Sequence, residues 1–318
     1  IGQKAFADCK SLTRIEIPSS VTQIEKQAFE FCTSLNEIIL PSSIKKIDEG
    51  CFYNCCSLTK IELPSSITCI SKNAFKKCKS LQEITIPSSI STISNSTFYL
   101  CDSLTKIDLP NTITKIGNNA FKECISLQEI TIPSSVKEIC MFAFKLCKSL
   151  KKIIIPDSVT SIGKNAFQSC SALEEVTISS SLKTIESFVF SECSKLTSVV
   201  IPSSVTAIES RAFEKCTSLG QVTISSSVKR IGSFCFFQCS SLTNITNSSS
   251  LLKIGKCAFK KCTLLKESSI PPTVTKIGRD AFQGCSSLNI LKISYYLRQR
   301  IKYIKITKRV NVCLIPYQ

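Results

Sequence analysis

Cysteine is the residue in this chain whose type and spacing offer the clearest chemistry. The sequence has 20 cysteines, and 13 of them recur every 23 residues from Cys9 to Cys285. In a secreted chain such a set would first suggest disulfides. This ladder is regular, contains an odd number of cysteines, and should point all of its side chains inward in parallel. These features instead favour free thiols that pack as small hydrophobes. We therefore predict a reduced, buried cysteine ladder.

Metal binding and catalysis are the competing uses of these thiols. The cluster Cys51, Cys55 and Cys56 contains no CxxC pair, and the chain has no histidine to complete four zinc ligands. A nucleophilic cysteine needs a base or a cationic, partly exposed setting, and none of the cysteines stands out in this respect. We predict that the protein is not an enzyme and uses no catalytic residues, metal, other cofactor or small-molecule substrate.

The cysteines belong to a 23-residue repeat, of which Ile116 to Glu138 is a representative copy. The isoleucine that opens the repeat returns from Ile1 to Ile277 without insertion or deletion, which gives 13 copies. With that isoleucine as position 1, position 6 is Phe and position 12 is Leu in every copy. A strict period of this length indicates a solenoid, in which each unit buries its apolar face against its neighbours. Residues 1–294 are thus predicted as one solenoid domain with no evident N-terminal cap.

Each repeat is predicted to contain a strand and a short helical turn. Residues alternate in polarity around positions 14 to 17, as in a half-buried strand, and stacking these strands predicts one long parallel sheet. Positions 1, 5, 9 and 12 are spaced as on one face of a helix, so we expect a short α- or 3₁₀-helical segment on the convex side. Val136 to Ile139 and its equivalents predict a second short strand. The fold class is therefore an α/β solenoid with its parallel sheet on the concave face.

The repeat register ends near residue 294. Residues 295–318 include six basic residues and no acid. Two interpretations stay open: a basic arm, or a degenerate C-terminal cap with Tyr303 to Ile306 as a further strand. Just before this tail, Asn247 and Ser268 occupy inward positions where packing favours isoleucine. A buried unpaired polar group costs about 1–3 kcal/mol, so we predict the weakest part of the stack here.

The pattern Leu-x-x-Ile-x-Ile-Pro-x-x-Val-x-x-Ile-Gly-x-x-Ala-Phe-x-x-Cys, of which Leu104 to Cys124 is a near copy, closely resembles the BspA-like leucine-rich repeat, the Treponema pallidum type. The resemblance covers about residues 1–294. Members of that family occur in bacteria and in protozoa such as Trichomonas, where they are viewed as surface antigens and adhesins that bind host proteins or other cells. The resemblance thus implies a non-catalytic scaffold, at the cell surface or secreted, that binds host or cell-surface proteins.

An intracellular protein–protein interaction scaffold in the cytoplasm is the alternative, because buried free thiols suit that compartment equally well. No apolar run approaches the ~20 residues needed to cross a bilayer, so no membrane-spanning segment is expected. The chain starts without Met on the first residue of a repeat. We therefore expect a fragment or a processed product.

Charges on the predicted concave sheet form an ordered pattern. Position 14 alternates in sign over eight consecutive strands, from Arg14 to Glu175. Opposite charges on neighbouring strands favour stacking in register, and the alternation suggests duplication of a 46-residue block. The competing interpretation is a partner surface with exposed apolar anchors. Its candidate residues are Ile39, Glu62, Lys106, Asp108, Glu129, Ile154 and Val200.

The excess positive charge lies elsewhere. The chain has a formal net charge of +17, and the basic excess of the repeats is concentrated at positions 22 and 23. This flank is either a solubilising edge or an anion-binding surface for sulfated glycan, acidic protein or anionic lipid. Its candidate residues are Lys45, Lys46, Lys137, Lys183, Lys229 and Arg230. A nucleic-acid binder through this flank is the third interpretation: the net charge permits it, but the sequence shows no interleaved aromatic and basic face and the broad sheet is acidic.

Overall fold

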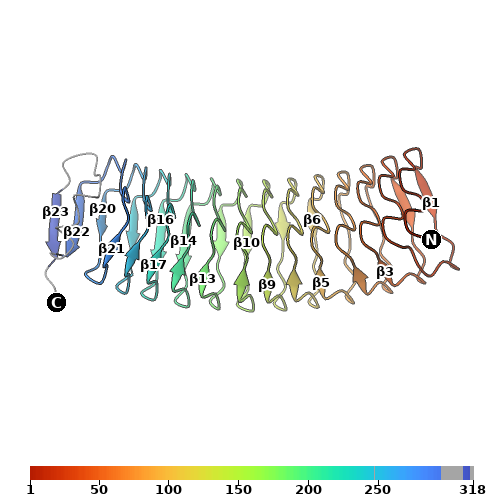
Figure 1. Ribbon diagram of the computed structural model, residues 1–318, viewed down its shortest axis with the longest axis horizontal. Coiled ribbons are helices and arrows are strands. Elements are labelled where there is room, and N and C mark those ends of the chain that lie inside the picture. The colour runs from red at the N-terminus through yellow and green to blue at the C-terminus, as the bar shows by residue number, and fades with distance from the viewer. Residues whose placement is uncertain (247, 295–310, 316–318) are drawn as a thin grey trace. The chain divides into compact units, whose positions relative to one another are not determined.

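A computed structural model of the chain describes residues 1–246, 248–294 and 311–315 (Figure 1). The chain divides into two compact units, residues 1–166 and 167–318. Each unit is a parallel-strand β-solenoid with turns of about 23 residues. The predicted boundary at residue 294 differs from this division and remains a prediction.

Unit 1, residues 1–166, has two columns of very short strands. The strands at positions 14 to 17 form what we call the front column: β1 (Arg14–Glu16), β2 (Glu37–Ile39), β6 (Lys106–Ile107), β8 (Glu129–Ile130) and β10 (Lys152–Ile154). The strands at positions 23 and 1 form the return column: β3 (Lys46–Ile47), β4 (Cys69–Ile70), β5 (Thr92–Ile93), β7 (Lys115–Ile116), β9 (Glu138–Ile139) and β11 (Ser161–Ile162). The second strand predicted near Val136 to Ile139 is thus confirmed.

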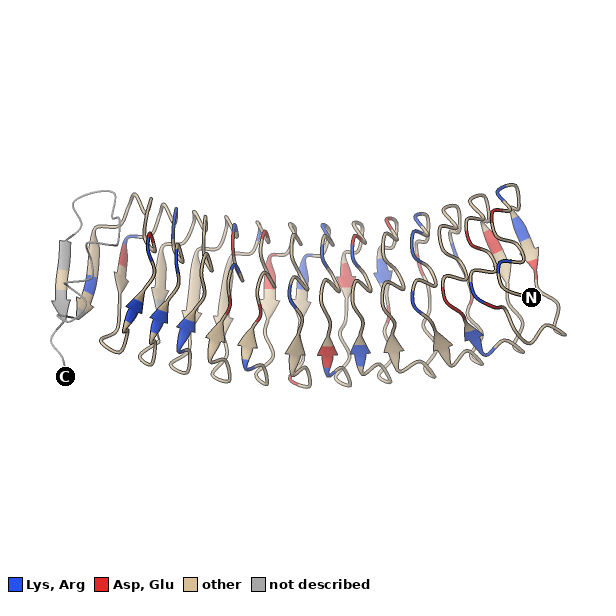
Figure 2. Cartoon of the chain, viewed as in Figure 1, with Lys and Arg blue, Asp and Glu red and all other residues tan. Residues whose placement is uncertain are grey.

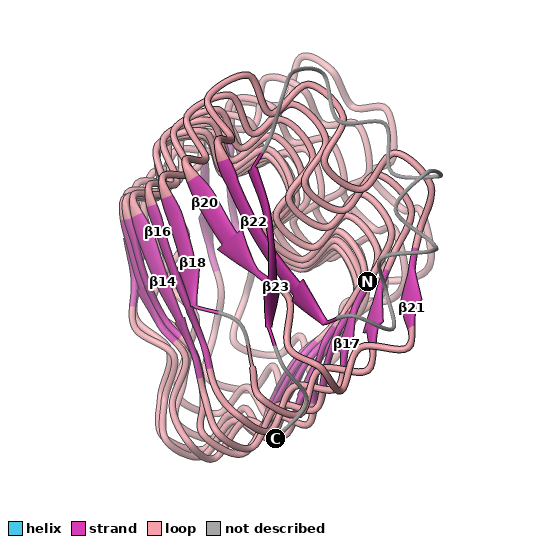
Figure 3. Ribbon diagram, turned by 90° about the vertical axis from the view of Figure 1, so that its left-hand side faces the viewer, coloured by secondary structure: helices cyan, strands magenta, loops and turns pink. Residues whose placement is uncertain are grey.

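Unit 2, residues 167–318, repeats this arrangement (Figure 3). Its front column contains β12 (Glu175–Thr177), β14 (Ser198–Ile201), β16 (Gln221–Ile224), β18 (Asn244–Thr246), β20 (Glu267–Ser269), β22 (Ile290–Ser294) and β23 (Asn311–Ile315). Its return column contains β13 (Thr184–Ile185), β15 (Ala207–Ile208), β17 (Arg230–Ile231), β19 (Lys253–Ile254) and β21 (Lys276–Ile277). The strand suggested for Tyr303 to Ile306 lies outside the described residues. Instead, β23 pairs in parallel with β22.

The core is a stack of identical side chains, as the repeat predicts. Position 6 places phenylalanines on successive turns, and the rings of Phe29, Phe52 and Phe75 stack with centroids 5.7 and 5.5 Å apart. The leucine at position 12 and the cysteine at position 9 pack beside them; Leu127 and Cys124, for example, are fully buried. Each turn therefore buries its apolar side chains mainly against equivalent side chains of its neighbours.

The helical segment predicted between positions 1 and 12 is wrong, because the described residues contain no helix. These residues accordingly include no helix long and apolar enough to span a membrane. The backbone turns left-handed at positions 4 and 8 of each repeat, as at Asn119 (φ 55°) and Glu123 (φ 61°), which a right-handed helix does not allow. Between these residues, the Phe121 N–H donates to the Ala143 carbonyl of the next turn at 2.8 Å. In a helix, backbone N–H groups donate to carbonyls of the same helix. In this stack, alternate N–H groups donate to carbonyls of the next turn.

Candidate functional site

The front column of unit 1 carries the alternating charges of position 14, and they lie in register. The residue pairs directly opposite one another are Arg14 with Glu37, Lys60 with Glu83, and Lys106 with Glu129. The guanidinium of Arg14 lies 3.3 Å from the carboxylate of Glu37, and the ammonium of Lys60 lies 3.6 Å from that of Glu83. The backbone pairing therefore joins a basic strand to the acidic strand that follows it.

The front column is divided into short sheets of two or three strands, such as β1–β2 and β6–β8 in unit 1, so the single long sheet predicted from the sequence is wrong. Within pairs, the Gln82 N–H lies 3.1 Å from the Thr59 carbonyl and the Gln128 N–H lies 3.0 Å from the Thr105 carbonyl. Between pairs the equivalent bonds lengthen, to 3.3 Å from Thr105 to Gln82 and 3.4 Å from Lys151 to Gln128. Two grooves lie between strand pairs, whereas a third spans the Lys60–Glu83 pair and the strand that follows it, so the grooves do not simply follow the 46-residue block.

The grooves contain most of the residues predicted for a partner surface. The groove between β2 and residues 59–62 has a volume of about 640 Å³ and includes Ile39 and Glu62. The groove between β8 and β10, about 390 Å³, includes Glu129 and Ile154. A third, about 300 Å³, contains Glu62 again, together with Lys106 and Asp108. The remaining predicted residue, Val200, is exposed on β14 in unit 2.

Strand periodicity explains why isoleucine side chains are exposed in two of these grooves. Ile153 and Ile155 are buried on either side of Ile154, which is 55% exposed, because successive side chains point to opposite faces. Ile39 is 39% exposed for the same reason. Nearby charges are paired along their own strands; Glu62, for example, lies 3.5 Å from Lys60. The groove beside Ile39 thus combines an apolar anchor with paired charges, and the groove between β8 and β10 contains a second apolar anchor, Ile154.

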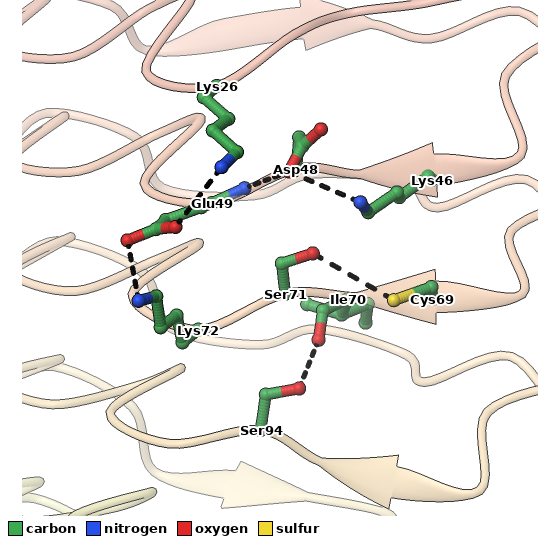
Figure 4. A network of polar contacts seen from close by, with 9 residues as sticks. All are labelled: Lys26, Lys46, Asp48, Glu49, Cys69, Ile70, Ser71, Lys72 and Ser94. Carbon is green, nitrogen blue, oxygen red and sulfur yellow. Dashed lines mark hydrogen bonds and ion pairs between the residues drawn. The ribbon is translucent and has the colours of Figure 1, made fainter.

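The predicted anion-binding flank lies on and beside the return column, and in unit 1 part of it is neutralised. The Lys46 ammonium lies 3.3 Å from the Asp48 carboxylate (Figure 4). On β7 and β9, Lys115 donates to Glu138 at 2.8 Å, and this hydrogen bond lowers the pKa of the Glu138 carboxyl. Lys45 and Lys137 are exposed at position 22. In unit 1, Lys46 and Lys115 thus pair with carboxylates, whereas Lys45 and Lys137 are exposed at the neighbouring position.

In unit 2 the flank contains Lys183 and Lys229 at position 22 and Arg230 at position 23, all exposed. Arg230 forms an ion pair with Glu209. The next two residues at position 23, Lys253 and Lys276, follow it on adjacent strands of one sheet (Figure 2). The cationic part of the flank is therefore most continuous on β17, β19 and β21.

The cysteine ladder is buried as predicted, and it has a bonding role that the sequence did not reveal. Within each unit, ladder thiols donate to the carbonyl of the phenylalanine 26 residues earlier, as from Cys124 to Phe98 at 3.1 Å and from Cys216 to Phe190 at 3.1 Å. Burial raises the pKa of the Cys285 thiol to about 12 and that of Cys124 further still. The described residues contain no group of three His, Cys, Asp or Glu side chains arranged to hold a metal ion. Buried ladder thiols thus join neighbouring turns through hydrogen bonds.

One interleaved aromatic and basic column does exist, contrary to the sequence interpretation. Position 7 on the turns of unit 1 carries Tyr53, Lys76, Tyr99 and Lys122 on successive repeats. The Lys76 ammonium lies 5.4 Å from the centroid of Tyr53 and 5.2 Å from that of Tyr99, while Lys122 lies 4.9 Å from Tyr99. Two lysines therefore contact the half-buried Tyr99 ring, which leaves less of it open for stacking with nucleic-acid bases.

Comparison with known proteins agrees with this repeat architecture. A family model described as "BspA type Leucine rich repeat region" matches residues 1–114, 91–219 and 183–305. The chain belongs to this family. The BspA-type chain is also similar to a leucine-rich repeat protein from Bacteroides ovatus, with 32% identity, a TM-score of 0.85, and coverage of 98% of this chain and 86% of that one.

Two further solved structures resemble this BspA-type protein. A leucine rich cell surface protein from Faecalibacterium prausnitzii is 28% identical, with a TM-score of 0.53 over 100% of this chain and 83% of that one. A leucine-rich repeat protein from Eubacterium ventriosum is 26% identical, with a TM-score of 0.56 over 90% and 80% of the two chains. No curated protein matches the sequence at a significant level.

Proposed function

We propose that this BspA-type protein is a non-catalytic scaffold that recognises another protein through the front column of unit 1. The observation that carries the proposal is the exposure of Ile39 and Ile154 in two grooves of the front column. Binding energy at protein interfaces is concentrated in a few apolar or aromatic anchors that fill pockets. Two such anchors on a rigid, regular surface suit a protein partner better than a small molecule.

Replacement of the anchors by aspartate tests this proposal. The bait is wild-type protein, and the prey is a biotinylated preparation of cell-surface proteins from which the bound species is identified and titrated. Ile39→Asp and Ile154→Asp should each weaken its Kd by about thirty-fold, which corresponds to a hot-spot loss of about 2 kcal/mol.

Ile125→Asp is the matched control, because Ile125 is 40% exposed in the same unit and lines none of the grooves. It should leave the Kd within about two-fold, since surface substitutions of this kind are usually nearly neutral. Unchanged binding by both groove variants, or an equal loss with Ile125→Asp, would show that the grooves are not the binding surface.

For the location of the protein, we infer the cell surface, with a role as an adhesin or antigen. Support comes from the similarity to the Faecalibacterium prausnitzii protein, which is described as a cell surface protein. The competing location is the cytoplasm, where the same fold would act as an internal assembly scaffold. Protease treatment of intact cells separates the two: a surface protein is degraded while a cytoplasmic marker survives, and a cytoplasmic protein stays intact until the cells are lysed.

A further inference from the structure

Three cations stand directly opposite one another on the return column of unit 2. Arg230 on β17 is the register partner of Lys253 on β19, and Lys253 is the partner of Lys276 on β21. Adjacent strands are about 4.8 Å apart, and all three side chains are exposed. The three residues, which we call the cation triad, therefore form a continuous row of positive charge (Figure 2).

This row is an exception to the charge pattern of the protein. On the return column of unit 1, Lys115 lies opposite Glu138, and on the front column Arg14 lies opposite Glu37. Opposite charges on neighbouring strands stabilise a sheet, whereas like charges directly opposite one another destabilise it. Arrangements that break a local rule without structural compensation are expected at functional sites.

Glycines beside the triad leave little room for neutralising acids. Position 2, just after each return strand, is glycine three times in succession, at Gly232, Gly255 and Gly278. A Cβ atom at Gly278 would lie 2.2 Å from the Lys256 nitrogen, and one at Gly255 would lie 2.4 Å from the Ser233 nitrogen. Because the backbones approach so closely, this position cannot hold a carboxylate on these turns. On the preceding turn Glu209 occupies it and pairs with Arg230.

Among the residues that the structure describes, acidic residues near the row pair with the arginines and not with the lysines. Lys256 and Arg279 are exposed three residues after Lys253 and Lys276. Arg279 lies 3.8 Å from the Asp280 carboxylate. In the described part of the chain, no carboxylate lies within ion-pair distance of Lys253, Lys256 or Lys276.

We propose that the cation triad binds a sulfated polysaccharide that lies across β17, β19 and β21. Lysine ammonium groups act as point charges and do not require the bidentate geometry that arginine supplies, so sulfates on a flexible chain can engage them in several registers. This site lies in unit 2, on strands other than the front column of unit 1. Its test is therefore independent of the proposed protein-binding surface.

Two other kinds of polyanion fit the triad less well. A single-stranded nucleic acid binds through bases stacked on aromatic rings, and the return strands β17, β19 and β21 carry no aromatic residue. An extended acidic peptide presents alternate side chains about 6.6–6.8 Å apart, which does not match cations repeated at the strand spacing. These polymers serve as competitors in the test.

Heparin-column chromatography in a salt gradient measures the proposed interaction. The wild-type protein should elute well above 0.15 M salt, whereas Lys253→Glu/Lys276→Glu should elute at or below it. Lys148→Glu/Lys195→Glu is the matched control, because it changes the net charge equally at two exposed lysines outside the return column. The control should keep most of the wild-type retention.

The competing explanations give different results. An equal loss in the control pair would show that net charge alone retains the protein, which overturns the triad. Duplex DNA or polyglutamate that displaces the protein from heparin as effectively as free heparin, at equal charge concentration, would overturn the assignment to sulfated polysaccharide.

A stability measurement guards against a variant that fails to bind because it is misfolded. Lys253→Glu converts three like charges in register into an alternating row, so its melting temperature should be equal to or higher than that of wild type while heparin retention falls. Lys148→Glu should raise neither the melting temperature nor the heparin retention. A lower melting temperature for Lys253→Glu would contradict the argument that the triad is kept at a cost in stability.

Discussion

At the scale of single residues, Ser268 is the described residue whose type agrees least with its position. It occupies an inward position of β20 where other turns carry an aliphatic side chain, it is 3% exposed, and its hydroxyl has no hydrogen-bond partner. Ser268→Val should therefore raise the free energy of unfolding by about 1–3 kcal/mol, because it removes an unsatisfied buried hydroxyl and adds apolar contacts. Urea denaturation followed by circular dichroism measures the change.

The control for this substitution is Thr223→Val on β16, since Thr223 points to the exposed face of the front column. Its effect should stay within about 0.5 kcal/mol. Equal stability of Ser268→Val and wild type would mean that water or a shifted backbone already satisfies the hydroxyl. The other inward polar residue, Asn247, lies outside the described residues, so the predicted weak part of the stack is tested at Ser268 alone.

The cysteine ladder shows what residue types alone can reveal. Burial of position 9 was predictable from the regular 23-residue period and is confirmed from Cys32 to Cys285, whereas Cys9 is half-buried. The thiol hydrogen bond was not, because the donor of Cys124 and the acceptor of Phe98 are 26 residues apart and meet only when one turn lies on the next. The Phe98 carbonyl also accepts the Cys101 N–H, at 3.1 Å. Position 9 thus favours a small side chain that packs in the core and donates a hydrogen bond to the neighbouring turn.

At the scale of elements, the left-handed residues at positions 4 and 8 define the turns. Asn119 has φ 55° and donates its N–H to Met141 of the next turn at 3.0 Å. Left-handed backbone costs an L-residue roughly 1–2 kcal/mol, with asparagine and glycine the best tolerated. Asn119→Val should therefore lower the free energy of unfolding by about 1–2 kcal/mol, whereas Asn119→Gly should be nearly neutral. Chemical denaturation of both variants checks the difference.

Gln128→Val provides the comparison, because Gln128 is exposed beside the front column and does not have a positive φ. A similar loss of stability there would attribute the effect of Asn119→Val to surface β-branching and not to the left-handed turn. Equal stability of Asn119→Val and Asn119→Gly would likewise contradict the argument.

These turns explain why the sequence suggested a helix. Side chains at positions 1, 5 and 9 point inward in the turns as they would on a helix, so apolar spacing cannot separate the two structures. A usable signal was present at position 4, where Gly50, Asn73, Asn119 and Asn165 are residues that tolerate left-handed backbone. The opposite happened on the front column: the sequence predicted the charge pairs but not the division into short sheets, which depends on the backbone pairing between turns.

At the scale of the whole molecule, the buried thiols of both units should make the fold sensitive to alkali. Burial raises the pKa of the Cys285 thiol from 9.0 to about 12, and it raises the pKa of Cys32 and of Cys140 to about 11. The folded state therefore keeps protons that the unfolded state loses above pH 9. This contribution to stability is fully present below pH 9 and is lost as the pH rises toward the folded-state values.

The expected result is a melting temperature that is nearly constant from pH 7 to 8 and falls steeply from pH 9 to 10.5 in the presence of a reductant. Each buried thiol removes about 1.4 kcal/mol of stability per pH unit in that range. Lysine deprotonation near pH 10.4 relieves repulsion within a basic protein and so acts in the opposite direction. Cys285→Ala should reduce the loss of unfolding free energy by about 1.4 kcal/mol per pH unit, the contribution of one thiol. Urea denaturation at pH 8 and pH 10 measures this difference. A melting temperature that is independent of pH up to 10.5 would show that the ladder thiols ionise as readily in the folded protein as in the unfolded chain.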